Sequence, residues 1–88
     1  MAPARRVPLA AGVAFNGNGA YRGFTVRETA AVVASFRIHE GLSATGTLLA
    51  AVSLPASGSV QFDTNVAFNG GLFVEVVAGT IEGGIFIA

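Results

Sequence analysis

The chain has 88 residues, of which 52% are hydrophobic and 11% charged, with five Arg, five acidic residues, one His, no Cys and no Trp. This length excludes a second core, and the lack of Cys excludes disulfides and thiolate metal ligands. The balanced charge argues against nucleic acid as the main partner, because phosphate contacts need a clustered excess of Lys and Arg. So few charges on a surface of about 4,800 Å² predict apolar patches that another subunit buries.

The first nine residues are predicted to form an extended arm. They contain two prolines, which fix φ and disfavour a helix at and before their positions. The arm contributes the residues that we expect to make assembly contacts: Arg5, Arg6, Val7 and Pro8. The alternative is a frayed terminal tail. The start of the chain also loosely resembles a short signal peptide, but Pro8 interrupts the apolar stretch, so we interpret it as part of the structure.

Alternation of side chains predicts strands through most of the remaining chain. The predicted strands cover residues 21–28, 31–40, 47–54, 60–62, 72–77 and 80–87. In the second of these, Phe36 and Ile38 share one face and His39 lies on the other. In the third, Leu48 is predicted to point inward. A helix over residues 28–38 is the alternative, and its β-branched pairs argue against it.

The last third of the sequence is apolar on both faces of its predicted strands. Such strands need a cover on each side, which either a second sheet or another subunit provides. We expect an oligomer interface that uses large apolar side chains, and the candidates are Leu49, Phe73, Val77 and Phe86.

Gly- and Asn-rich turns separate the predicted strands. About seven short strands at this spacing predict an all-β fold for residues 10–88, a single small antiparallel β-sandwich or barrel of jelly-roll or immunoglobulin-like type. The pentapeptide Val-Ala-Phe-Asn-Gly occurs at residues 13–17 and again at 66–70. This repeat records either a duplicated half-sandwich or simple convergence, and one short match favours convergence.

Candidate catalytic groups are few. A triad of Ser43, His39 and Asp63 can be proposed, but His39 lies beside a predicted turn, and a solvated strand end is the preferred interpretation. Glu75 and Glu82 could form a carboxylate pair, although protection of strand edges by charge explains them better. The carboxylates and the His lack the tight spacing of a metal site. We therefore predict that the chain is not an enzyme and uses no cofactor or metal.

Residues 21–30 and 71–83 resemble small β-rich proteins encoded among the structural genes of tailed bacteriophages, particularly those of actinobacteria. The resemblance implies a virion structural protein, namely a capsid decoration or cement protein with a β-sandwich or barrel body and an N-terminal arm. It further implies a homotrimer, a major capsid protein as partner, and a place on the capsid surface after synthesis in the bacterial host cytoplasm. Nucleic acid and membranes are not expected partners.

The alternative function is a tail or fibre module that binds host-surface polysaccharide. Sugar sites usually present an exposed aromatic ring beside polar groups. The sequence offers one such cluster, formed by Tyr21, Arg22 and Asn18.

Overall fold

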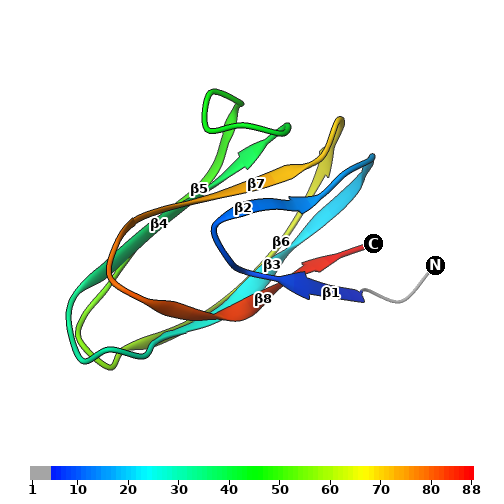
Figure 1. Ribbon diagram of the computed structural model, residues 1–88. Coiled ribbons are helices and arrows are strands. Elements are labelled where there is room, and N and C mark those ends of the chain that lie inside the picture. Colours follow the sequence, from blue (N-terminus) through cyan, green and yellow to red (C-terminus); the bar gives the residue numbers. More distant parts are fainter. Residues whose placement is uncertain (1–4) are drawn as a thin grey trace.

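The computed structural model describes residues 5–88, which form eight antiparallel strands and no helix (Figure 1). The strands are β1 (Arg5–Pro8), β2 (Gly12–Phe15), β3 (Gly19–Glu28), β4 (Ala34–Glu40), β5 (Leu48–Leu54), β6 (Ser59–Phe68), β7 (Leu72–Ala78) and β8 (Ile81–Ile87). They build two four-stranded sheets: sheet A has the order β1-β8-β3-β6, and sheet B has the order β2-β7-β4-β5. The predicted all-β sandwich is confirmed, with eight strands instead of about seven. This part of the chain has no helix that could cross a membrane.

The core lies between the two sheets, where every second side chain of the central strands is buried. Phe24 of β3 and Phe36 of β4 meet across the layers with their ring centroids 5.6 Å apart in an edge-to-face arrangement. Strand β4 starts at Ala34, later than predicted, and Val32 and Val33 are exposed in the loop before it. The helical alternative for residues 28–38 is wrong, because the alternate burial of β4 places its apolar residues on one side of a sheet.

The two halves of the chain have the same topology. Strands β1 to β4 correspond to β5 to β8 in order, since the pairs β2·β7 and β4·β5 of sheet B match the pairs β6·β3 and β8·β1 of sheet A. The repeated pentapeptide occupies equivalent places at the β2–β3 and β6–β7 turns. Its two aromatic rings, Phe15 and Phe68, contact edge to face at 5.9 Å. The structure thus favours a duplicated half-sandwich over convergence.

Residues 5–8 of the predicted arm belong to the sandwich. They form β1, which pairs with β8 of the same chain so that Arg5 lies opposite Ile87 and Pro8 opposite Gly84. Sheet A therefore begins within the segment 1–9 and not at residue 10. Residues 1–4, the rest of the predicted arm, lie outside the described part of the chain.

Two glycines allow close approaches in sheet A. Gly23 has a φ of +117° at the irregularity where the register between β3 and β6 shifts, and a Cβ there would collide with the carbonyl oxygen of Phe62. Gly84 lies beneath the side chain of Arg6, which a Cβ at that position would displace. The first glycine lets β3 and β6 approach closely at the register shift, and the second leaves room for the Arg6 side chain.

Candidate functional site

The side of the sandwich formed by β5 and β6 is incompletely closed, and we call it the open side. Val60 and Phe62 of β6 pair with Val26 and Phe24 of β3, so they lie on the inner face of sheet A. They are nevertheless 38% and 46% exposed, and Val66 on the same face is 41% exposed. Sheet B does not cover these side chains as it covers those of β3. The open side consequently carries an apolar surface that continues the core.

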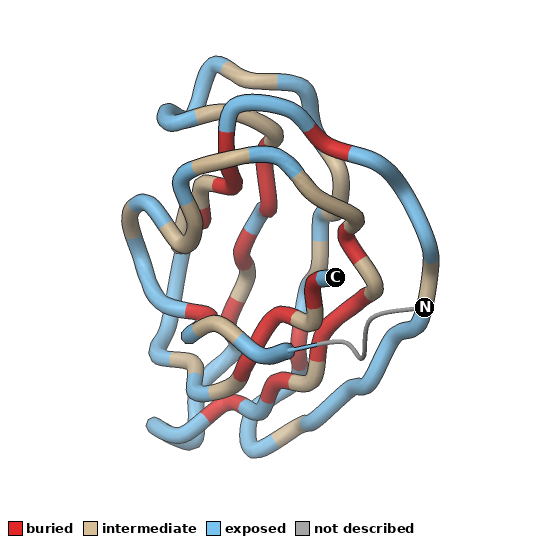
Figure 2. Tube along the Cα trace, turned by 90° about the vertical axis from the view of Figure 1, so that its right-hand side faces the viewer, coloured by how far each residue is buried: buried red, intermediate tan, exposed pale blue. Residues whose placement is uncertain are grey.

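The open side also has a long free strand edge. One edge of β6 pairs with β3, and among residues 5–88 no strand pairs with its other edge. Nearly every residue of β6 is exposed, and the strand is pale blue along most of its length in Figure 2. Between Glu40 and Glu75 the only charged residue is Asp63, which lies in this strand. The surface therefore combines unpaired backbone groups, apolar side chains and little charge.

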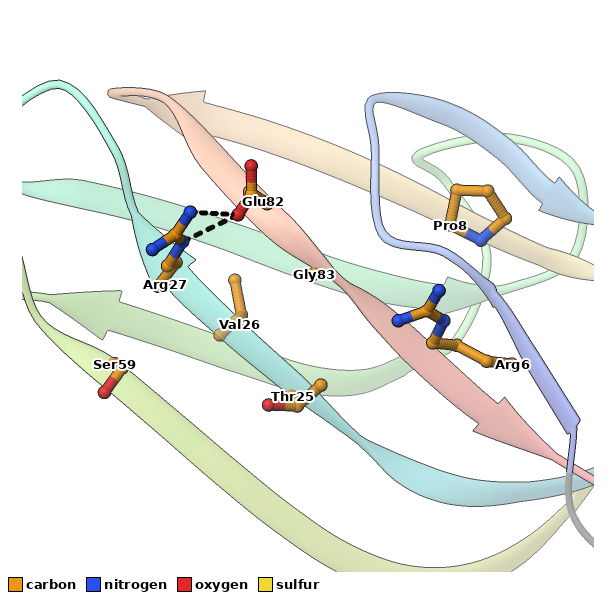
Figure 3. A pocket seen from close by; sticks show the side chains of 8 residues that line it. All are labelled: Arg6, Pro8, Thr25, Val26, Arg27, Ser59, Glu82 and Gly83. Atoms are coloured by element: carbon orange, nitrogen blue, oxygen red, sulfur yellow. Dashed lines mark hydrogen bonds and ion pairs between the residues drawn. The ribbon is translucent and has the colours of Figure 1, made fainter.

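A shallow depression of about 640 Å³ lies on the outer face of sheet A (Figure 3). Its floor is the side-chain-free stretch at Gly83, and its rim includes Arg6 and the ion pair of Arg27 with Glu82. The Arg27 Nη2 and Glu82 Oε1 atoms are 2.5 Å apart, but both side chains are more than half exposed, so the pair adds little stability. Arg6 can offer hydrogen bonds here to an anionic or hydroxylated group.

His39 is buried, and the prediction of a solvated strand end is wrong. Its side chain is in contact with two acceptors: Nδ1 lies 3.1 Å from the Gly46 carbonyl oxygen and Nε2 lies 3.1 Å from Oε1 of Glu75. Arg37 Nη1 is 3.8 Å from the same carboxylate oxygen. These contacts join β4 to β7 and to the loop that follows β4, so the His39 side chain stabilises the packing of these elements.

The predicted triad does not assemble. The Ser43 hydroxyl lies 2.8 Å from that of Thr45, and it has no hydrogen bond to His39. Asp63 belongs to β6 in sheet A, whereas His39 belongs to sheet B. The order of the strands in the two sheets separates these residues in a way that their sequence positions did not reveal.

Glu75 and Glu82 also lie in different sheets, on β7 and β8. Each has its own cation, because Glu75 faces His39 and Arg37 while Glu82 pairs with Arg27. The carboxylate pair considered from the sequence is therefore wrong, and so is the protection of strand edges, because β7 and β8 are inner strands of their sheets. Within residues 5–88, no three His, Asp or Glu side chains gather closely enough to hold a metal ion.

Glu28 has a structural role that its place in the sequence does not indicate. This side chain is 4% exposed at the end of β3 and accepts hydrogen bonds from the backbone N–H groups of Ser57, at 2.7 Å, and Ala30, at 2.5 Å. Burial alone would raise the pKa of Glu28, but backbone N–H donors, led by that of Ser57, outweigh it and lower the pKa. The carboxylate thus joins the β3–β4 loop to the β5–β6 connection, and no local motif signals a donor 29 residues away.

The predicted sugar-binding cluster is wrong because Tyr21 is 1% exposed and belongs to the core. Its hydroxyl has no hydrogen-bond partner among the described residues, and burial raises the pKa of Tyr21 to about 12. Asn18 instead accepts a hydrogen bond from the backbone N–H of Gly70 at 2.9 Å, which joins the two equivalent turns.

The four predicted interface residues do not form one surface. Leu49 packs partly against the core, because the β4–β5 register shifts at His39 and places Leu48 opposite it. Leu48, predicted to point inward, is 52% exposed. On β7, Phe73 lies between the buried Leu72 and Val74, so it is on the outer face of sheet B, and Val77, four residues later in the strand, is on the same face. Phe86 lies on the outer face of sheet A, between the buried Ile85 and Ile87.

The predicted arm contacts are divided between the two faces of sheet A. Arg5 lies over the Phe15 ring, with its guanidinium carbon 5.4 Å from the ring centroid. Val7 packs against the core, while Arg6 and Pro8 line the depression on the outer face. Their role in assembly stays a prediction.

Comparisons with protein-family models, with curated proteins and with solved structures found no match.

Proposed function

We propose that this chain is a non-enzymatic structural protein that functions within an assembly of subunits. The observation that carries the proposal is the open side, where Val60, Phe62 and Val66 face the interior of the sandwich but remain exposed. Apolar surface beside a free strand edge is a liability for an isolated monomer, and association with another subunit removes it. The single His contacts the Gly46 carbonyl oxygen and the Glu75 carboxylate, and in this proposal it stabilises the fold and has no catalytic role.

The more specific role that we propose is a capsid decoration protein of a tailed bacteriophage. This part of the proposal depends on the resemblance of the sequence to small virion proteins. Its partners are further copies of the chain and the major capsid protein, and its location is the capsid surface. A small charge-poor sandwich suits that role, because neighbouring capsid subunits cover the surface that the sandwich leaves exposed.

The alternative role, a tail or fibre module that binds host-surface polysaccharide, loses its candidate site. The only aromatic ring of that site, Tyr21, is in the core.

Immunogold electron microscopy of purified virions, combined with mass spectrometry of their proteins, tests the proposal. An antibody against the folded chain should label the capsid shell, and the chain should be abundant in the virion. If the antibody labelled only the tail, the result would contradict capsid decoration and support the alternative role as a tail or fibre module. Absence of the chain from virions that are otherwise complete would overturn both.

A further inference from the structure

The side chains of β6 offer little of the protection that an edge strand usually has, and the one irregularity of the strand is the shift of its register with β3 between Asp63 and Val66. Its ten residues include no Lys, Arg or Pro, and its single charged residue is Asp63. We propose that this edge pairs with β6 of a second copy of the chain, antiparallel about a two-fold axis that passes midway between Thr64 and the partner's Thr64. The inference rests on the self-association in the proposed function and specifies the surface that mediates it.

The sequence of β6 is complementary to itself in this register. When Thr64 faces the partner's Thr64, the residues on the inner face match as apolar pairs, because Phe62 lies opposite the partner's Val66 and Val60 opposite the partner's Phe68. On the outer face, Asp63 lies opposite the partner's Asn65, whose amide can donate to the carboxylate. Opposed apolar pairs, hydroxyl pairs and polar pairs of this kind stabilise antiparallel strands.

Neighbouring registers are less favourable. An axis through Asp63 would place two carboxylates directly opposite each other, which destabilises a strand pair. An axis through Asn65 would place the Thr64 hydroxyl against the apolar Val66 of the partner and Asp63 against Ala67 of the partner. The register about Thr64 is the one that matches every inner apolar residue of β6 with an apolar residue.

The size of the surface fits a second copy. Nine residues of β6, from Val60 to Phe68, overlap in this register, which corresponds to a length of about 30 Å. The smallest extent of the molecule is 16 Å. A side of these dimensions buries about 1,000 Å² over the two copies, the lower limit for a specific interface. Between Glu40 and Glu75 the only charged residue is Asp63, so the pairing desolvates few charged side chains. The product is a dimer, in place of the trimer that the resemblance implies.

Single-cysteine variants of the full chain test this pairing, because the natural sequence has no Cys. Opposite residues of an antiparallel pair have Cα atoms about 4.5–5.5 Å apart, within the range that a disulfide spans. Thr64→Cys should therefore form a disulfide-linked dimer under mild oxidation, measured on a non-reducing gel. The matched control is Gln61→Cys on the same strand. In the proposed dimer its two cysteines, one in each copy, would be about 20 Å apart. We expect at least tenfold more crosslinked dimer from Thr64→Cys.

A mixed pair of variants covers the case in which Thr64→Cys perturbs folding. Gln61 and Ala67 are both exposed, and the register places them opposite each other across the axis. An equimolar mixture of Gln61→Cys and Ala67→Cys should form the heterodimer in excess over either homodimer. Equal crosslinking in all combinations would overturn the register.

Light scattering of the unmodified chain separates the outcomes. A dimer together with selective crosslinking at Thr64 supports the β6 pair. An oligomer whose crosslinks are not selective would overturn the β6 pair but leave an assembly protein that uses another surface. A monomer at every concentration would overturn the β6 pair, while immunogold labelling of virions would still decide the proposed function.

Discussion

The two lateral sides of the sandwich are equivalent in topology and opposite in character. On one side, β1 and β2 have four residues each, and Leu9 in their connection is 2% exposed and packs into the core. On the other side, the equivalent strands β5 and β6 have seven and ten residues, and Phe62 remains 46% exposed. The first side closes its own core and the second does not.

The two sides also differ in charge, and we relate this difference to assembly. The closed side carries Arg5 and Arg6, which keep its edge strand hydrated, whereas the open side carries only Asp63. Two units with the same strand order have thus diverged in strand length and in charge. The longer and less charged unit is the one that we expect to meet another subunit.

The largest expected effect comes from comparing the two ends of β6. Phe68 is 1% exposed and Phe62 is 46% exposed on the same face of the strand. Phe68→Ala should lower the free energy of unfolding by about 4 kcal/mol, because it leaves a cavity in the core. Phe62→Ala should cost about 1 kcal/mol, since it removes only part of a contact with Phe24. Urea denaturation of dilute protein measures both, and equal losses would show that the open side is as well packed as the core.

The next comparison sets two leucines from the two sides against each other. Leu9→Ala should cost about 3 kcal/mol, because Leu9 fills the closed side. Leu48→Ala, at a position 52% exposed on β5, should cost less than about 1 kcal/mol. Thermal melts of both variants, followed by circular dichroism, provide the test. A loss from Leu48→Ala as large as that from Leu9→Ala would contradict the distinction between the two sides.

The sequence predicted the central strands better than their edges. Alternation placed Phe36 and Ile38 on one face of their strand, and that face is buried, because central strands of a sandwich have one side in the core. It placed Leu48 on the wrong face, because a one-residue register shift in a sheet reverses every side chain beyond it.

The side-chain clusters were harder to predict than the strands. The contacts of His39 with Glu75 and of Glu28 with Ser57 join residues that are 36 and 29 positions apart, so they depend on strand order, which no local pattern specifies. The open side itself was predicted only as an unspecified apolar surface. Its position became visible once the order of the strands placed β5 and β6 at the same side.

Tyr21 tests whether the core beside the open side excludes water. It lies opposite Val66 of β6, and burial raises its pKa to about 12 from the ordinary value of 10.0. Between these two values the unfolded chain loses the phenol proton while the folded chain keeps it, so the free energy of unfolding falls as the pH rises, by roughly 2 kcal/mol in full.

Urea denaturation of the native chain and of Tyr21→Phe at pH 9 and pH 11.5 measures this contribution. The variant should lose less stability over this interval, and near neutral pH it should be as stable as the native chain or slightly more so, since it removes an unpaired buried hydroxyl. Identical pH profiles would mean that water reaches Tyr21 through the open side.

The smallest expected effect concerns the end of the open side, where Glu28 holds the β5–β6 connection through Ser57. Because the pKa of Glu28 is lowered in the folded chain, its ionised form contributes stability at neutral pH, and that contribution is lost as the pH falls below the ordinary value of 4.5 and through the folded pKa. Glu28→Gln keeps the shape of the side chain but not its charge, so its melting temperature should be lower than that of the native chain at pH 7 and should approach it at pH 3. Glu82→Gln is the matched control, because that carboxylate is exposed and makes a weak ion pair. If Glu28→Gln lost no more stability than the control, the carboxylate would not anchor the connection, and the packing of the strands alone would have to hold the open side in place.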